Sequence, residues 1–358
     1  MIVCYLGPFD PDLTRNRVII KGLLQNNVEL VQCNTIPSKK RVIDWMKVLK
    51  YLGSRYDVIM IGARGDYYNQ PLVPIVKSLT KTPVVFDSML TLYETQVIDR
   101  QRVGVSSFKA NLWRLLDGSA LRRADLVLSD TEAHLRYYSN FYKESITKFR
   151  RVLIGTDDDV FYPRDFKKEN DDFLVMYWGN YIPLHGIEYI VKAAKLLENH
   201  VDIKFELIGS GQMRQSCLAM SKALGLKNIS FNNTYVPFEK LPSCVVKADV
   251  TLGNFGNSQK SKRVITCKAV DSIAMGKPLI TGDSPAAREV FKHLDNCCLV
   301  PMANPRALAK AILELRNNEN LRRKIGQNGY KLFKERLSPK IIGKHLKSDL
   351  IELIESKR

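Results

Sequence analysis

The sequence has no apolar run of the roughly 20 residues that a membrane-spanning helix needs. Its five histidines show no metal-binding spacing such as HExxH, and its seven cysteines include no CxxC pair. We therefore expect neither a metal site nor structural disulfides. The first residues, MIVCYLGPFDP, favour a short strand over a signal peptide, so we expect a cytoplasmic protein.

Acidic residues are scarce relative to basic ones, and the formal net charge is +18. Residues 1–151 and the rest of the chain each carry +9 of this excess. A nucleic-acid-binding protein concentrates its charge on one patch or arm, so we expect no nucleic-acid partner. Anionic substrates or an anionic membrane surface remain as explanations of the charge.

Short apolar segments alternate with segments of helical periodicity along the whole chain. This alternation predicts an α/β fold of two Rossmann-like domains, each a doubly wound parallel sheet. Six strands are expected at residues 2–7, 28–33, 57–63, 83–87, 126–130 and 150–155, and six more at residues 173–179, 203–209, 229–233, 249–254, 278–283 and 297–301.

A polar, charged stretch separates the two sets of strands. We predict an N-terminal, acceptor-binding domain at residues 1–152, a linker at 153–172 and a C-terminal, nucleotide-sugar-binding domain at 173–337. A final helix at 338–358, which begins after Ser-Pro, is expected to pack back towards the N-terminal domain. Ligands of such sheets bind beyond the carboxyl ends of the strands, so we expect the site in a cleft there.

Four motifs in the second half, in this order, carry a resemblance to a known family: the restart FLVMYWG, the turn GNYIPLHGIEYI, LIGSG and VDSIAMGKPLITGD. Together they resemble glycosyltransferase family 4, as does the GTDDDVFYP link before them. The resemblance implies the GT-B fold and transfer of a sugar from a UDP- or GDP-sugar, with retention of configuration. It further implies a glycan or lipid-linked acceptor and no required metal or other cofactor.

The turn at 179–186 departs from the family pattern Gly-Arg-x-x-Pro-x-Lys-Gly. Asn180 stands in place of the arginine and His185 in place of the lysine, so neither supplies an obligatory charge at pH 7. The resemblance implies that both bind the donor, together with Gly179, Gly209 and Thr266. The alternative is that Asn180 and His185 are ordinary turn residues.

Two family glutamates, with seven residues between them, are replaced by Arg263 and Asp271. Asp271 keeps a carboxylate, and the resemblance implies that it accepts from the ribose hydroxyls of the donor. Arg263 is our candidate for a bidentate clamp on the leaving diphosphate, with Lys260 and Lys262 nearby. The alternative for this KSKR run is a solvated basic loop.

The first half offers candidates of its own. Arg15 or Asn16, after the first strand, is predicted either to reach a phosphate of the donor or to cap the first helix. Asp87 and Glu94 are candidates for contacting the acceptor hydroxyl where the family often has a catalytic histidine, although Asp87 alternatively caps the next segment. His134 follows a helix start signal and is predicted to pack near the sheet.

Residues 100–123 combine six basic residues with apolar ones. We expect Trp113 to be exposed among the charges, where it would help the protein to bind the inner face of a membrane peripherally. The alternative is an ordinary surface helix. Four apolar residues share one stripe and are expected to pack on the sheet: Phe108, Leu112, Leu115 and Leu116.

The substituted family positions leave two alternatives to a transferase. One is a non-catalytic partner subunit that binds a nucleotide without transfer, and the other is a nucleotide-sugar epimerase with the same fold. Release of nucleoside diphosphate from a nucleotide-sugar discriminates between transfer and binding alone.

Overall fold

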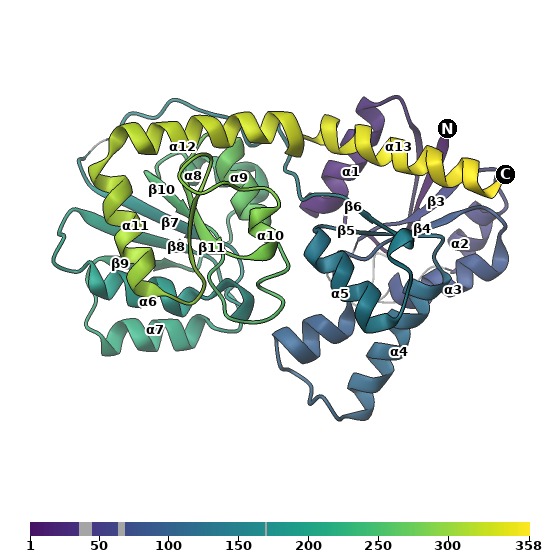
Figure 1. Cartoon of the computed structure of the whole chain (residues 1–358), viewed down its shortest axis with the longest axis horizontal. Coiled ribbons are helices and arrows are strands. Elements are labelled where there is room, and N and C mark those ends of the chain that lie inside the picture. Colours follow the sequence, from purple (N-terminus) through teal and green to yellow (C-terminus); the bar gives the residue numbers. More distant parts are fainter. Residues whose placement is uncertain (36–44, 64–68, 169) are drawn as a thin grey trace. The chain divides into compact units, whose positions relative to one another are not determined.

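The computed structural model describes residues 1–35, 45–63, 69–168 and 170–358. The chain divides into two compact units, each with its own sheet and hydrophobic core (Figure 1). Unit 1 comprises Met1–Asp157 together with Ser338–Arg358, and unit 2 comprises Asp158–Leu337.

The sheet of unit 1 has strands that all run parallel. The strands are β1 (Ile2–Gly7), β2 (Glu29–Asn34), β3 (Val58–Ile61), β4 (Val84–Asp87), β5 (Leu126–Ser129) and β6 (Phe149–Arg151), in the order β2-β1-β3-β4-β5-β6. Every residue of β3, β4 and β5 is buried. Strands covered on both faces need continuous apolar runs, which is why VIMI and VVF show no polar alternation.

The last helix of the chain is part of unit 1, where it lies along the first helix (Figure 1). The helices of this unit are α1 (Thr14–Gln25), α2 (Trp45–Leu52), α3 (Asn69–Leu79), α4 (Phe108–Arg123), α5 (Glu132–Tyr142) and α13 (Pro339–Lys357), with a π-helical turn, η1, at Glu94–Asp99. The α1 and α13 backbones touch at Gly22 and Gly343, where a Cβ on Gly343 would lie 2.1 Å from the Gly22 carbonyl carbon. Because the two helices pack so closely, Leu346 and Leu350 of α13 reach the core.

Unit 2 repeats the same architecture. Its strands are β7 (Phe173–Trp178), β8 (Ile203–Ile208), β9 (Ile229–Asn232), β10 (Val250–Leu252), β11 (Leu279–Asp283) and β12 (Cys298–Pro301), all parallel and in the order β12-β11-β10-β7-β8-β9. Its helices are α6 (Ile187–Leu196), α7 (Arg214–Ala223), α8 (Leu241–Val245), α9 (Cys267–Ala274), α10 (Pro285–Arg288), α11 (Pro305–Asn317) and α12 (Glu319–Leu332).

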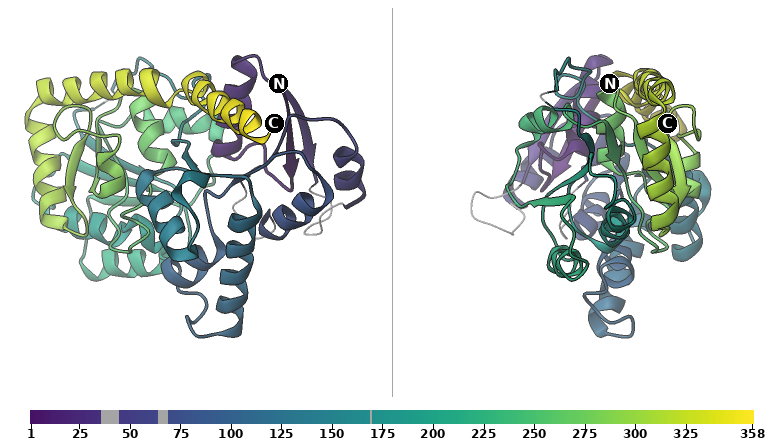
Figure 2. Two further views of the ribbon diagram at one scale, coloured as in Figure 1. Left: turned by 45° about the vertical axis from the view of Figure 1, so that its right-hand side comes forward. Right: turned by 90° about the vertical axis from the view of Figure 1, so that its left-hand side faces the viewer.

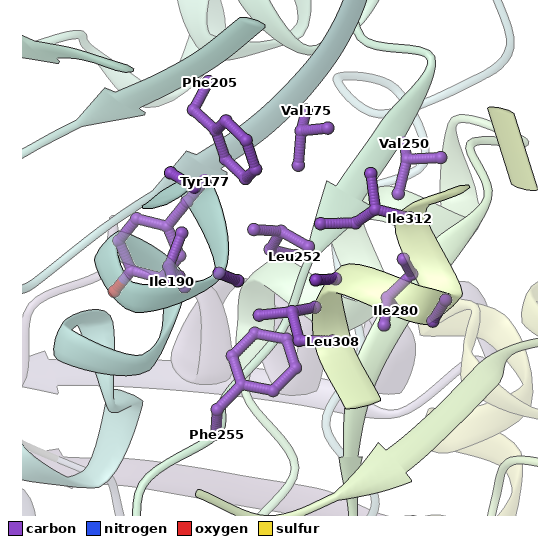
Figure 3. Close-up of a cluster of buried hydrophobic side chains, with 14 of the residues drawn as sticks. Val175, Tyr177, Ile190, Phe205, Val250, Leu252, Phe255, Ile280, Leu308 and Ile312 are labelled. Atoms are coloured by element: carbon purple, nitrogen blue, oxygen red, sulfur yellow. The ribbon is translucent and has the colours of Figure 1, made fainter. Parts of the chain in front are cut away.

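The core of unit 2 lies between the central strands and the helices α6 and α11. Figure 3 shows Val175, Leu252 and Ile280 of the sheet meeting Ile190 of α6 and Ile312 of α11. These apolar contacts fix β7 and β10 side by side, and the loops that leave their carboxyl ends lie at the same edge of the sheet. The predicted fold, two parallel α/β sheets, is confirmed, and all twelve predicted strands are present.

Candidate functional site

The turn after β7 is shaped by glycines. Gly179 and Gly209 both adopt positive φ, of 120° and 133°, and a Cβ on Gly209 would lie 2.1 Å from the Gly179 carbonyl oxygen. Gly186, at φ 65°, would place a Cβ 2.5 Å from the Gly256 nitrogen. No side chain fits at these approaches, so the β7 and β8 loops close against each other and against the β10 loop.

His185 ends this turn and is held in one orientation. Its Nδ1 lies 2.8 Å from the Tyr177 hydroxyl and also contacts the Asn180 carbonyl oxygen. A carbonyl oxygen only accepts hydrogen bonds, so Nδ1 carries the proton of the neutral ring. Nε2 is therefore the acceptor, and it faces the Lys268 ammonium nitrogen at 3.2 Å.

Lys268 lies in the first turn of α9, and its side chain reaches back to the β7 turn. It is 5% exposed, and its ammonium lies 5.0 Å above the Tyr177 ring. Burial lowers the pKa of Lys268 to about 7, and the nearby Cys267 and Asp271 oppose this only in part. Lys268 was not predicted from the sequence, although a single lysine inside the apolar run VITCKAV was a usable signal.

The start of α9 has polar groups in addition to Lys268. Thr266 precedes the helix in an extended conformation without capping it, and among the described residues its buried hydroxyl oxygen has no hydrogen-bond partner. Asp271 lies three residues after Lys268 in the same helix and is also buried. The ribose role of Asp271 and the donor role of Thr266 remain predictions.

The KSKR run forms a turn, and the alternative of a solvated basic loop does not hold for Lys260, which is buried. The Ser261 hydroxyl donates to the Gly256 carbonyl at 2.7 Å, and the Arg263 N–H donates to the Lys260 carbonyl at 2.9 Å. Lys260 is 1% exposed, whereas Lys262 and Arg263 are half-buried. The turn therefore holds Arg263 just before α9.

Arg15 and Asn16, two of the candidates in unit 1, are occupied inside that unit, which corrects our prediction for them. The Arg15 guanidinium makes a two-pronged ion pair with the Asp87 carboxylate, at 2.9 and 3.0 Å, and both side chains are buried. Asn16 accepts from the Tyr5 hydroxyl at 2.8 Å and donates to the Ala63 carbonyl at 2.9 Å. The Arg15 charge is therefore neutralised, and Asn16 has its hydrogen bonds within the fold.

Asp87 and Glu94, the predicted acceptor-contacting carboxylates, are corrected for the same reason. Asp87 is bound to Arg15, and Glu94 lies 2.8 Å from Nε2 of His134, whose Nδ1 lies 2.8 Å from Asp130. Burial opposes a charge on His134, but the two carboxylates outweigh it and raise the pKa of His134 to about 9. His134 packs inside unit 1, and Glu94 acts there as its counter-ion.

The buried and exposed faces of helix α4 are the reverse of those predicted. Its Asp117 carboxylate accepts from the Leu92 and Tyr93 N–H groups at 3.0 and 2.8 Å, and Trp113 packs with the cluster that contains Tyr93. Apolar residues of the predicted buried stripe lie outside instead: Phe108 is 84% exposed, Leu112 42% and Leu115 67%. The start of α4 and the loop before it project from the body of unit 1 (Figure 2).

Comparison with known proteins finds similar sequences for the second half of the chain. Residues 159–332 match the family Glycosyl transferases group 1. An uncharacterized glycosyltransferase of Methanocaldococcus jannaschii, MJ1178, is 27% identical over 210 residues, which are 56% of this chain and 53% of that protein. The putative glycosyltransferase EpsD of Bacillus subtilis is 23% identical over 45% of this chain and 41% of its own. The chain thus spans about half the length of the curated relatives it matches.

Solved structures extend the likeness in fold to the whole chain. HepE of Anabaena, determined with UDP and glucose, superposes with a TM-score of 0.72 at 14% identity, over 98% of this chain and 100% of that one. A sucrose-phosphate synthase of Thermosynechococcus elongatus reaches 0.74 at 16% identity, over 99% of both chains.

The fold is that of the GT-B glycosyltransferases, with both sheets represented. Residues 159–332 resemble the Glycosyl transferases group 1 family, and the curated relatives with similar sequences are named as glycosyltransferases. Among the described residues, no helix is both long and apolar enough to cross a membrane.

Proposed function

We propose that the protein is a retaining glycosyltransferase of family 4, which transfers a sugar from a nucleotide-sugar to a glycan or lipid-linked acceptor. The observation that supports it most is the family match of residues 159–332, which covers the β7 turn and α9 together. The structural neighbour HepE was determined with UDP, and the donor proposed here carries the same kind of diphosphate. Unit 2 is the proposed donor-binding unit.

The proposed chemistry requires the protein to stabilise a leaving nucleoside diphosphate. Negative charge develops on the diphosphate as the bond to the sugar breaks, and cations and helix N-termini stabilise it. Arg263, held by its turn immediately before α9, is our proposed clamp on that charge. In a retaining transfer the leaving phosphate can itself take the acceptor proton, so the reaction needs no separate base from the buried carboxylates of unit 1.

The test is release of nucleoside diphosphate from a panel of UDP- and GDP-sugars, with and without glycan and lipid-linked acceptors. We expect release from one donor, accelerated by an acceptor, and a product whose anomeric configuration is that of the donor sugar. Binding without release from any donor would favour a non-catalytic subunit. Conversion of the nucleotide-sugar to its epimer without release would favour an epimerase.

Asp271→Asn is predicted to weaken binding of the nucleoside diphosphate. A carboxylate that accepts from two ribose hydroxyls is exchanged for an amide with one acceptor oxygen, and hydrogen bonds to charged groups contribute about 1.5–3 kcal/mol. Titration calorimetry with UDP and GDP measures this loss, and pyrophosphate, which has no ribose, is expected to bind equally well to both forms. Unchanged nucleotide affinity would contradict the ribose role.

We also propose that unit 1 binds an anionic membrane surface through the exposed stripe of α4, which we define as Phe108, Leu112 and Leu115. These residues recur at intervals of four and three, as the apolar side of a surface-bound helix requires. Exposed basic residues accompany them: Arg102, Lys109, Arg114, Arg122 and Arg123. Apolar side chains flanked by cations are complementary to anionic lipid.

Replacing Phe108, Leu112 and Leu115 together with serine is expected to weaken sedimentation with anionic vesicles about tenfold or more, since inserted apolar side chains drive this binding. Higher salt is expected to weaken binding of the unmodified protein as well. Tyr235→Ser is the matched control, because Tyr235 is 85% exposed in unit 2. Equal binding to neutral and anionic vesicles would contradict the proposal.

A further inference from the structure

Lys268 is buried, and among the described residues it has no salt-bridge partner. An ammonium group has three N–H donors, yet in the described structure the hydrogen bond of Lys268 is to one acceptor, Nε2 of His185. The Asp271 carboxylate, three positions further along α9, favours the charged form of Lys268 but offsets only part of the effect of burial on its pKa. Lysine is almost never buried unless it is paired, so an anion from outside the chain would balance this charge.

The ammonium is aimed at the glycine turn after β7. A Cβ on Gly179 would lie 3.2 Å from Cε of Lys268 and 3.7 Å from Nζ, so the side chain fills the space beside that glycine. The buried Thr266 hydroxyl, which has no partner among the described residues, precedes Lys268 by two positions at the N-terminus of α9. A hydroxyl and an ammonium with spare donors thus accompany the positive end of the helix dipole.

We propose that Lys268, positioned by His185, is the cation that binds the diphosphate of the donor at the turn 179–186. This inference rests on the proposed function. The charge that the turn itself lacks would then come from α9, because the Lys268 side chain reaches from this helix to Gly179 of the turn. Arg263 remains a separate cation, in the turn that precedes the same helix.

His185 acts here as a positioning residue. With its proton on Nδ1 and the Asn180 carbonyl as acceptor, its Nε2 holds the ammonium by accepting one of the three donors. The other donors of Lys268 stay available to phosphate oxygens. His185→Gln keeps an acceptor and is expected to retain most of the diphosphate affinity, whereas His185→Leu removes the acceptor and is expected to lose it.

A buried cation without a counter-ion also reduces stability, and this gives a second readout. The folded pKa of about 7 lies below the ordinary 10.5, so between these values the unfolded chain binds a proton that the folded chain does not. The loss of stability caused by burying the ammonium therefore has its full size below pH 7. It diminishes as the pH rises from about 7 to 10.5. The groups around the ammonium are Tyr177 of β7, His185 of the turn, and Cys267 and Asp271 of α9.

Titration calorimetry with inorganic pyrophosphate, UDP, GDP and the parent nucleosides tests the inference on Lys268→Met. We expect diphosphate binding to weaken roughly 10- to 100-fold, as loss of a charged hydrogen-bond donor implies. At pH 6 the same variant is expected to unfold at a higher temperature than the unmodified protein. At pH 9 the difference between their unfolding temperatures is expected to be smaller. A lysine with a merely structural role would not show increased stability together with lost affinity.

Lys277→Met is the matched control, because the Lys277 ammonium donates to the Val246 and Ala248 carbonyls at 2.6 and 3.0 Å. It is expected to lose stability and keep its affinity. Unchanged diphosphate binding in Lys268→Met overturns the inference and leaves the proposed function standing. If the unmodified protein binds pyrophosphate but no nucleotide, the anion site stands and the nucleotide-sugar function falls. If it binds neither, both fall.

Discussion

Arg263→Ala is expected to lower the rate of sugar transfer about 10²- to 10³-fold, whereas Asn180→Ala is expected to have a much smaller effect. Loss of one preorganised donor to a developing anion typically has that magnitude. Arg263 is fixed by the turn before α9, while the Asn180 side chain is exposed and its carbonyl is already bonded to Tyr177 and His185. Single-turnover rates with a saturating nucleotide-sugar provide the measurement.

The variant Arg263→Lys tests whether the positive charge of Arg263 is sufficient or whether the two-pronged guanidinium is needed as well. A lysine keeps the positive charge but not the two-pronged fork, so it is expected to recover only part of the rate. Arg306→Ala is the matched control, since Arg306 is an exposed arginine of unit 2 with no proposed role, and it is expected to leave the rate unchanged. A larger rate loss in Asn180→Ala than in Arg263→Ala would show that the glycine turn alone clamps the diphosphate.

The sequence was sufficient to predict the fold because parallel strands leave a strong local pattern. Runs such as VIMI and FLVMYW have to be apolar on both faces, and the helical segments between them show a different period. The carboxyl edge of the sheet in unit 2, where β7 and β10 end, follows from that topology. The place of the candidate site was therefore predictable.

The partners of charged side chains were not predictable, because pairing depends on residues far apart in the chain. Arg15 and Asp87 are separated by 72 positions, and Glu94 and His134 by 40. From the sequence each was a polar residue near a strand end, as a ligand-binding residue would be. The fold brings each pair together in the interior of unit 1, where the two charges neutralise each other.

The orientation of α4 was predicted wrongly for a related reason. Apolar spacing shows which residues share a face of a helix, but not whether that face or the opposite one packs inward. The Asp117 carboxylate, which caps the Leu92 and Tyr93 N–H groups, anchors the other face. The apolar stripe at Phe108, Leu112 and Leu115 is consequently exposed, which makes it a better candidate for membrane binding than Trp113.

Asp87→Ala is expected to reduce the free energy of unfolding by roughly 3–5 kcal/mol, because it leaves the Arg15 guanidinium buried without its counter-ion. The side chains of Arg15 and Asp87 are 2% and 0% exposed, so solvent cannot replace the lost carboxylate. The Val152 carbonyl, to which Arg15 also donates, accepts a hydrogen bond but carries no full charge. For a unit of this size, calorimetry is expected to show a fall in the melting temperature on the order of 10 °C.

Asp12→Ala is the matched control, because the Asp12 carboxylate pairs with Arg17 at the same 2.9 Å, but its side chain is 80% exposed. Exposed pairs of this kind contribute about 0–1 kcal/mol, so this variant is expected to melt near the unmodified protein. The double variant Arg15→Met/Asp87→Leu removes both charges and is expected to recover part of the loss, since the penalty arises from the unpaired ion. Equal, small losses in Asp87→Ala and Asp12→Ala would mean that Arg15 is hydrated in solution, and Arg15 would again be a candidate for binding a phosphate.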